Sequence, residues 1–440
     1  MIKLGTAVFL CFLLILGCDR DSGPESTQVL ADLEAISIST QFDPLAGDEL
    51  QRFRGLVAGA RVVSLGQSRH DISEQLKIQA MLSRNLVSDL GFRVVILEES
   101  FSHGLALDDY VATGDGDLRS ILNNVAGWYL WDTEEVVSFF EWVRRFNETE
   151  PQGGRVYVFG MDITAPALGV RRAAAVAEAL DPGSNWASLE YGLDLHVGDM
   201  WPQSLQRYSR LTQEESETIG KNLASLSEFL AGRAGGADAI EEMRLAALEA
   251  EIGVRAHNMF SAAGMAAIGA AREDGMVANV NWILQRAGTK ARAVIWTHNL
   301  HAARSSFQMP QLVEGDLLPM GVLLDRHYGS KYVAMGAAFG SGEFPANLPP
   351  GQRSFSRPDR HKVDGAIGAL GFDAALLILA GLPESSSAHE WLSVEREWRM
   401  QDTSVFLSPL RGFDAIYYVD TVTRAQLTPL ALKRHSPQAD

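Results

Sequence analysis

Short runs of β-branched and aliphatic residues alternate with longer amphipathic runs along most of this chain, and that alternation limits the folds open to it. Residues 61–66 ("RVVSLG") and 92–99 ("FRVVILEE") have the composition of strands, and apolar residues recur at helical spacing over 72–87 between them. A strand, a helix and a strand within about 40 residues form a βαβ unit with parallel strands. The sequence therefore predicts an α/β fold.

The same alternation recurs in the rest of the chain. Further strands are expected at 155–162, 291–299, 331–339, 374–380 and 414–420. Between about 165 and 285 the sequence is largely helical, and we expect residues about 200–262 to form a helical layer or insertion. The predicted architecture is a mostly parallel central sheet flanked by helices.

The first 18 residues have the features of an export signal. "MIKLGTAVFLCFLLILGC" contains one lysine, an apolar run too short to span a membrane comfortably, and a glycine directly before Cys18. Its "ILGC" box resembles the bacterial lipoprotein cleavage site, in which the cysteine is lipidated. We expect 1–18 to be a lipoprotein signal peptide, 19–40 a tether and 41–430 one catalytic domain facing the periplasm or exterior; a plain signal anchor is the alternative.

The net charge and the positions of the cysteines exclude some classes of binding partner and some kinds of chemistry. The chain has a net charge of −17, which argues against nucleic acid and against adsorption on anionic lipid, because both favour basic surfaces. The membrane is therefore expected as a partner only through the lipid anchor. Both cysteines, Cys11 and Cys18, lie in the signal, so the mature sequence contains no disulfide, thiol nucleophile or cysteine-ligated metal.

Polar and ionisable side chains follow four of the expected strands at the point where each strand ends. In parallel α/β sheets, ligands bind beyond the carboxyl ends of the strands. The residues at these ends are Gln67 with His70, Glu98, Asp162, and His298 with His301. Four converging ends fit an active site that has a general base and charge partners.

Some of the candidate residues also have structural explanations. Glu74 and Asp71 fit a capping box at the start of the helix after the first strand, and Glu74 is also a candidate second-layer residue of the site. Glu98 is harder to explain structurally, because an unpaired carboxylate at the end of an apolar strand is costly. Trp131 is either a core residue or part of a substrate platform.

Seven segments carry a resemblance to a known family. "VVSLGQSRHDISE", "GFRVVILEE", "FFEWVRRFNE" before "VYVFGMD", "AREDGMVANVNWIL", "AVIWTHNLH" and "MGVLLDRHYGSKY" occur in the order, and at roughly the spacing, of the erythromycin esterase family. The resemblance spans about 60–425. Members of that family include enzymes that hydrolyse the macrolactone ester of macrolide antibiotics. The resemblance implies a small-molecule ester or lactone as substrate, and we expect no cofactor.

The resemblance also implies roles for individual residues. It makes His70 the general base for a hydrolytic water and places Glu98 and His298 in the same cleft, with Arg272 facing the pocket. We expect Glu98 to orient His70 or the water, and His298 to stabilise the oxyanion or protonate the leaving alcohol. Of His298 and His301, one is expected to pack and the other to act.

The first histidine turn departs from the family pattern at two positions. The family usually has Gly-Glu-x-x-His-Gly-x-x-Glu, and here Gly66, His70 and Glu74 match. Gln67 replaces the usual glutamate and Asp71 the usual glycine. A glutamine can orient the imidazole but carries no charge, so a non-catalytic ligand-binding protein on the same scaffold is the second hypothesis.

The nucleophile is expected to be water. No Gly-x-Ser-x-Gly elbow follows an expected strand, and the mature sequence offers no thiol. Water could be activated by a histidine alone or by a metal. The metal version would use His70 and Glu74 at i,i+4 spacing together with His298 and His301 at i,i+3 spacing. Both versions stay open, and the metal-independent hydrolase is the leading hypothesis.

The anchoring hypothesis predicts the behaviour of Cys18→Ser. Without the thiol that carries the lipid, we expect an unprocessed precursor that partitions differently from the wild type during detergent extraction of membranes. Processing and partitioning equal to those of the wild type would show that Cys18 is not lipidated.

Overall fold

The computed structural model of the protein describes residues 27–40, 47–123, 131–150, 154–196, 201–236, 240–344 and 353–435. The expected signal peptide with Cys18 and residues 19–26 of the expected tether lie outside these ranges, whereas residues 27–39 of that segment form a helix and a strand of the fold. Within the ranges, every helix is too short or too polar to cross a lipid bilayer.

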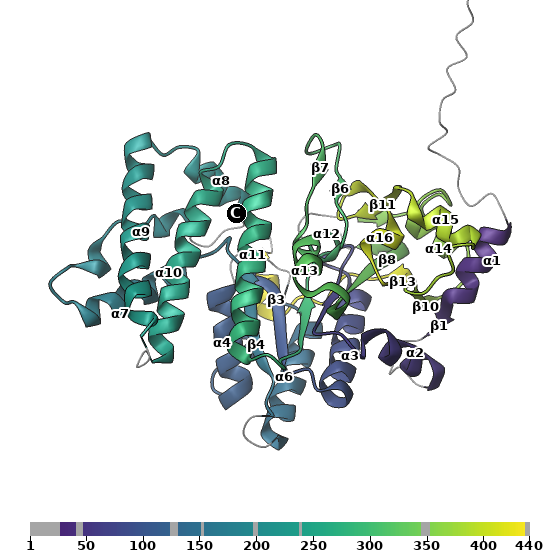
Figure 1. Ribbon diagram of the computed structural model, residues 1–440, viewed down its shortest axis with the longest axis horizontal. Helices are drawn as coiled ribbons and strands as arrows, with labels where there is room; N and C mark the ends of the chain where they lie inside the picture. Colours follow the sequence, from purple (N-terminus) through teal and green to yellow (C-terminus); the bar gives the residue numbers. More distant parts are fainter. Residues whose placement is uncertain are drawn as a thin grey trace, which may run out of the picture.

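A large sheet forms the centre of the fold (Figure 1). Its strand order is β1-β10-β13-β8-β2-β5-β3-β4, and β9 pairs with β8. The strands are β1 (Ser37–Ser39), β2 (Val62–Leu65), β3 (Val94–Ser100), β4 (Tyr157–Asp162), β5 (Ala293–Trp296), β8 (Tyr332–Phe344), β9 (Arg353–Phe355), β10 (Ala374–Ile378) and β13 (Ala415–Val422). From β13 to β4 all neighbours are parallel, whereas β10 is antiparallel to both β1 and β13. The predicted α/β fold with a mostly parallel sheet is confirmed.

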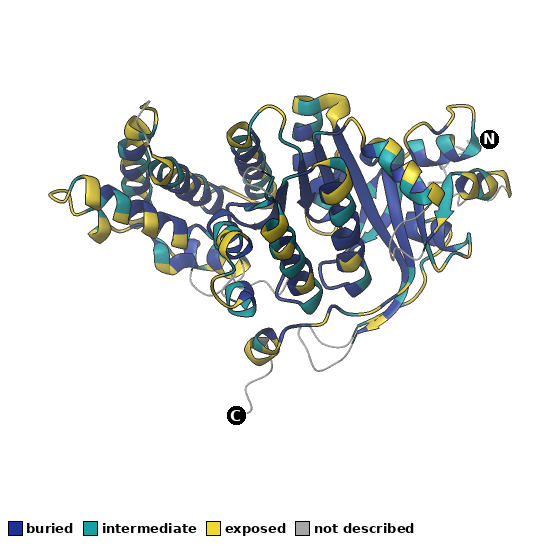
Figure 2. Cartoon of the chain, turned by 90° about the horizontal axis from the view of Figure 1, so that it is seen from below, coloured by how far each residue is buried: buried dark blue, intermediate teal, exposed yellow. Residues whose placement is uncertain are grey.

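Both faces of the sheet are covered, which explains the nearly continuous apolar character of its strands. In β3, Val94 and Ile96 belong to one core and Val95 and Leu97 to the other. Figure 2 shows the strands as a buried layer between helices whose outer surfaces are exposed. The helices on the Val95 side are α2 (Gly47–Val57), α3 (Ser73–Leu90), α5 (Leu118–Asn123) and α6 (Glu134–Thr149).

The other face carries a thick helical layer, in which α7 and α9 lie at the left in Figure 1, farthest from the sheet. Its helices are α7 (Ala167–Leu180), α8 (Trp201–Tyr208), α9 (Gln213–Ala234), α10 (Glu241–Phe260) and α11 (Met265–Ala287). A capping box between Thr212 and Glu215 begins α9. Small residues allow close packing: a Cβ on Gly253 would lie 2.5 Å from a methyl group of Val170.

The described residues form eleven further helices, most of them short. They are α1 (Thr27–Ile36), α4 (Phe101–Thr113), η1 (Trp186–Ser188), η2 (Leu193–His196), α12 (Asn299–Ala302), α13 (Met320–Tyr328), η3 (Gly329–Lys331), α14 (Val363–Gly368), α15 (Ser387–Ser393), α16 (Pro409–Gly412) and α17 (Pro429–His435). Of these, α4 follows β3 directly and packs against β4.

A second, small antiparallel sheet was not predicted. It consists of β6 (Phe307–Gln308), β7 (Asp316–Leu317), β11 (Arg396–Met400) and β12 (Thr403–Leu407). The hairpin between β11 and β12 turns at Gln401, which has a φ of 53°. That conformation favours glycine or asparagine, so "MQDT" gives none of the usual hairpin signals.

The capping box predicted for Asp71 and Glu74 is wrong. Helix α3 begins at Ser73, and its N-cap residue Ile72 offers no side-chain hydrogen bond. The Asp71 carboxylate instead accepts two hydrogen bonds from the Arg69 guanidinium, at 2.8 and 3.0 Å. A competing charged partner outweighs the backbone N–H groups that a capping carboxylate would bind.

The contact between α4 and β4 predicts the effect of Gly104→Ala. A Cβ at this position would lie 1.9 Å from the Gly160 nitrogen, and backbone cannot move aside cheaply. We expect a loss of about 1–3 kcal/mol in the free energy of unfolding, measured by urea titration. The control is Gly232→Ala in α9, where nothing lies within 4 Å, so stability should stay equal or rise. Equal stabilities of the two variants would contradict this account.

Candidate active site

Glu98, near the carboxyl end of β3, is the centre of a buried polar cluster. Its Oε2 accepts hydrogen bonds from the Thr297 hydroxyl and the His298 N–H, both at 2.8 Å. Its Oε1 accepts one from Arg272 Nη2 at 2.9 Å. Burial alone would raise the pKa of Glu98, but His301, His70 and Arg272 hold it well below its usual range. Glu98 is therefore an ionised residue that is only 3% exposed as a whole and 1% exposed in its side chain.

Arg272 links the ends of two strands to the helical layer. It projects from α11, and its Nη2 lies 2.7 Å from Asp162 Oδ2 at the end of β4. Burial works against the charged form, but Asp162 and Glu98 together raise the pKa of Arg272 above its ordinary value. Asp162 and Arg272 thus lie in the same cluster as Glu98 and form an ion pair there.

His301 is the positively charged histidine of the cluster. Its Nδ1 lies 2.6 Å from Glu273 Oε1, and its Nε2 lies 3.2 Å from Glu98 Oε1. Burial would lower the pKa of His301, but the two carboxylates raise it to about 10. Arg272 Nη1 also lies 3.3 Å from Nε2; because an imidazolium offers no lone pair, this is a contact between two cations rather than a hydrogen bond.

His70 is held by a relay of two glutamine amides. Gln79 Nε2 donates to the Leu65 carbonyl at 2.7 Å, so its Oε1 is left to accept from Gln67 Nε2, also at 2.7 Å. Gln67 Oε1 must then accept from His70 Nδ1, 3.1 Å away. The proton of the neutral ring is therefore on Nδ1, and Nε2 carries the lone pair. Burial lowers the pKa of His70 to about 4, which keeps the ring neutral at physiological pH.

His298 is close to His70 but has both ring nitrogens engaged. The two ring centroids are 5.0 Å apart. His298 Nε2 donates to the Ser68 carbonyl at 3.0 Å, and Nδ1 accepts from the Leu300 N–H at 3.1 Å. In this conformation His298 positions the turn before His70. The expected role in oxyanion or leaving-group chemistry stays a prediction, and it requires His298 to release the Ser68 carbonyl.

The strand ends approach closely because Gly66 has no side chain. A Cβ at Gly66 would lie 2.3 Å from Asn299 Oδ1. The Asn299 amide bridges both backbone groups of Ala337, at 2.8 and 2.9 Å, while its own N–H donates to the Gln67 carbonyl at 2.7 Å. This arrangement brings the first histidine turn and "WTHNLH" together.

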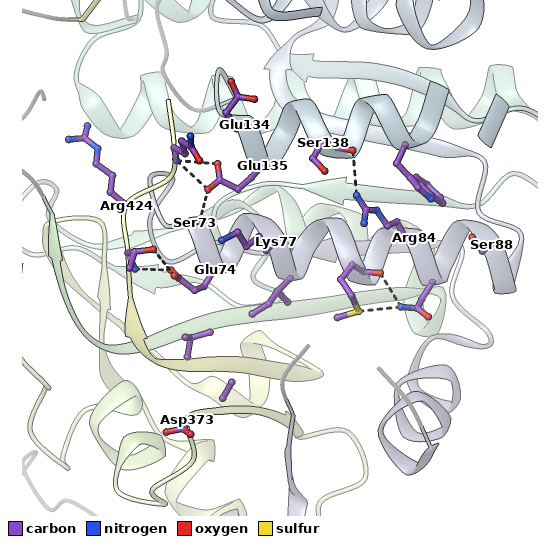
Figure 3. Close-up of a pocket in the computed structure, with 18 of the residues that line it drawn as sticks. Ser73, Glu74, Lys77, Arg84, Ser88, Glu134, Glu135, Ser138, Asp373 and Arg424 are labelled. Carbon is purple, nitrogen blue, oxygen red and sulfur yellow. Dashed lines mark hydrogen bonds between the residues drawn. The ribbon is translucent and has the colours of Figure 1, made fainter. Parts of the chain in front are cut away.

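Glu74 faces away from the cluster. Its carboxylate accepts hydrogen bonds from the Thr423 N–H and hydroxyl at 2.8 and 2.6 Å, beside a groove of about 1030 Å³ along α3 (Figure 3). The four-residue ligand set of the metal hypothesis is therefore not assembled, because Glu74 and the His298 nitrogens are engaged elsewhere. In the part of the chain that the structure describes, no group of three metal-ligating side chains is found.

Trp131 is a core residue with a link to the site. It is fully buried beside Trp296, and its indole N–H donates to the Glu98 carbonyl at 3.0 Å.

Two polar residues of the cluster, Glu273 and Gln79, were not predicted from the sequence. Glu273 directly follows Arg272 in "AREDGM", which was a usable signal, whereas Gln79 lies in the middle of a helix and gave none.

The fold and the cluster together define an α/β protein with a buried histidine–carboxylate centre suited to acid–base chemistry. The erythromycin esterase family matches residues 87–422. That span includes Glu98, Asp162, Arg272, His298 and His301, and it begins after the turn that holds His70. The chain belongs to the erythromycin esterase family, and this membership supports a hydrolase of the esterase type.

Solved structures share the fold. A succinoglycan biosynthesis protein aligns with a TM-score of 0.77 at 20% identity, covering 92% of this chain and 100% of that one. A Bacillus cereus protein gives 0.77 at 21% identity, covering 91% and 98%. A histidine-to-asparagine mutant of the erythromycin esterase EreC, in its open conformation, gives 0.71 at 18% identity, covering 89% and 99%. At these identities the likeness establishes the fold.

The pKa of His70 is lowered and that of His301 is raised, and these two shifts predict how the free energy of unfolding depends on pH. An unfolded histidine has a pKa of about 6.5. The pKa of about 4 for His70 means that its contribution is present above pH 6.5 and is lost as the pH falls toward 4. The pKa of about 10 for His301 means that its contribution is complete below pH 6.5 and is lost as the pH rises toward 10. We expect the free energy of unfolding to be highest near neutral pH, measured by urea titration across this range.

The matched control for this prediction is His301→Asn. Its lower stability should vary less with pH on the alkaline side than that of the wild type, because the group that binds the extra proton is gone. An unchanged alkaline slope would show that His301 does not hold its proton in the folded state.

Proposed function

We propose that the protein hydrolyses an ester or lactone with a water activated by His70. The observation that carries this proposal is the amide relay through Gln67 and Gln79, which puts the His70 proton on Nδ1 and the lone pair on Nε2. A general base needs an unprotonated nitrogen of defined orientation. The family membership supports the reaction type, and a small-molecule ester, including a macrolide lactone, is the proposed substrate class.

Two carboxylates near His70 favour the formation of an imidazolium. When Nε2 takes a proton from water, the ionised Glu98 and Asp71 favour the new positive charge, whereas His301 and Arg272 oppose it. Arg272 and His301 contribute positive charge on the other side of Glu98, where an oxyanion would form. The lipid anchor at Cys18 and a location outside the cytoplasm remain part of the proposal.

His70→Ala tests this function in the mature protein. We expect kcat/KM on a panel of esters and lactones to fall by about 100-fold or more, while Tm stays within a few degrees, because the lost group acts in the reaction. His327→Ala, on the exposed end of α13, is the control and should change neither quantity. A parallel loss of folding and activity would make His70 a structural residue.

The acid side of the pH–rate profile is a second readout of the same base. Since the pKa of His70 is lowered to about 4, kcat/KM should stay nearly constant down to about pH 5. In Gln67→Glu, a carboxylate next to Nδ1 should raise the pKa of His70 and move this acid limb to higher pH. An acid limb near pH 6.5 in the wild type would exclude the buried, neutral His70 as the base.

The alternative is a binding protein without catalysis. It is favoured by one observation: Gln67 stands where a charged residue is usual in the family. A wild type that hydrolyses no member of the panel, combined with activity in Gln67→Glu, would establish that alternative.

A further inference from the structure

The end of β3 holds a second carboxylate, Glu99, beside Glu98. The pairing with β4 shifts here: Leu97 lies opposite Gly160, and Ser100 lies opposite Asp162. Glu98 and Glu99 therefore oppose a single residue, Met161, which is the pattern of a β-bulge. Side chains normally alternate between the two faces of a strand, and a bulge re-aims them. The bulge brings both carboxylates to the edge of the sheet where the cluster lies.

Glu99 pairs with a histidine that the proposed reaction has not used. Its Oε1 accepts a hydrogen bond from the Ser100 N–H at 2.7 Å and lies 3.3 Å from His103 Nδ1. Burial raises the pKa of Glu99, and neighbouring Asp162 raises it further, whereas His103 lowers it. Ser100, the residue after Glu99, lies opposite Asp162 in the register of β3 and β4, and Asp162 pairs with Arg272, so this pair lies beside the ion network of Arg272.

The backbone holds His103 firmly in that place. The side chain projects from the first turn of α4, and the next residue, Gly104, packs against the Gly160 backbone. A Cβ on Gly160 would in turn lie 2.1 Å from the Ser100 carbonyl oxygen. These two glycines allow the start of α4 to pack directly against the ends of β3 and β4, which fixes the backbone at His103.

His103 is also the more accessible partner. Its side chain is 15% exposed, compared with 5% for Glu99 and 1% for Glu98. With Nδ1 bound to Glu99, the second nitrogen, Nε2, has no hydrogen-bond partner among the described residues. An imidazole with a carboxylate on one nitrogen and an open second nitrogen is the arrangement of a proton donor or acceptor.

We propose that His103, oriented by Glu99, is the general acid that protonates the leaving alkoxide; this inference rests on the proposed ester hydrolysis. His70 takes one proton from water, and the hydroxide oxygen forms a bond to the carbonyl carbon. When the tetrahedral intermediate collapses, the bond from carbon to the alkyl oxygen breaks, and that oxygen takes a proton from His103 Nε2. His70 then releases its proton and His103 regains one from solvent, so one water is consumed and an acid and an alcohol are formed.

The proposal predicts that only substrates with a poor leaving group depend on His103. A p-nitrophenolate leaves without a proton, whereas the alkoxide of an alkyl ester or lactone needs one. In the mature protein we expect His103→Gln to lower kcat/KM on alkyl esters and lactones by about 100-fold, with little change on p-nitrophenyl esters of the same acid. Added imidazole should partly restore alkyl-ester hydrolysis in His103→Ala.

Three controls make the outcome decisive. His327→Gln should leave both substrate classes unchanged, and Tm of His103→Gln should match that of the wild type. Glu99→Gln, which removes the charge behind the ring, should lower alkyl-ester hydrolysis by a smaller factor and again spare p-nitrophenyl esters. An equal fall on both substrate classes in His103→Gln, or no fall on either, overturns the proposal while leaving His70 hydrolysis intact. A wild type inert on both classes means that the proposed function itself has failed.

Discussion

The ionised Glu98 is the interaction on which the rest of the site depends. Removing a carboxylate from water costs several kcal/mol, and only close partners offset that cost. Here the partners come from three separate elements: Thr297 and the His298 N–H after β5, His301 in α12, and Arg272 in α11. The ion pair between Glu98 and Arg272 therefore connects the helical layer to the sheet. Loss of Arg272 would leave the Glu98 carboxylate buried without this partner and would weaken the contact between α11 and β3.

Two late segments of the chain hold the first histidine turn in place. In segment 423–428, the Ala425 N–H donates to the Asp71 carbonyl at 2.8 Å, and Glu74 binds Thr423 from the start of α3. In the β11–β12 hairpin, the Gln401 N–H donates to the Ser68 carbonyl at 2.7 Å. The turn is short and polar, so these contacts supply the rigidity that a strand or helix would otherwise give. A polar turn in the N-terminal part of the chain is thus held in place in part by segments from its C-terminal part.

The residues that meet at the edge of the parallel sheet could be predicted from the sequence. Features that depend on contacts with side chains or turns distant in the sequence could not. Glu98, Asp162 and His301 meet because the carboxyl ends of β3, β4 and β5 lie at one edge, a rule that needs no side-chain detail. The direction of Glu74 could not be predicted, because Thr423 lies far away in the sequence. The β11–β12 hairpin could not be predicted either, because its turn uses Gln401 in a conformation that glycine normally adopts.

The exchange of glutamate for glutamine at position 67 is explained by a second glutamine in the helix after the turn. A glutamate at 67 would orient His70 through its charge, and no partner behind it would be needed. A glutamine can bind His70 through either its oxygen or its nitrogen, so its orientation has to be imposed. Gln79 imposes it, because its own amide is held by the Leu65 carbonyl and leaves only an oxygen for Gln67. The relay thus keeps the tautomer that a base requires, and the negative charge that favours an imidazolium comes from Glu98 on the neighbouring strand end.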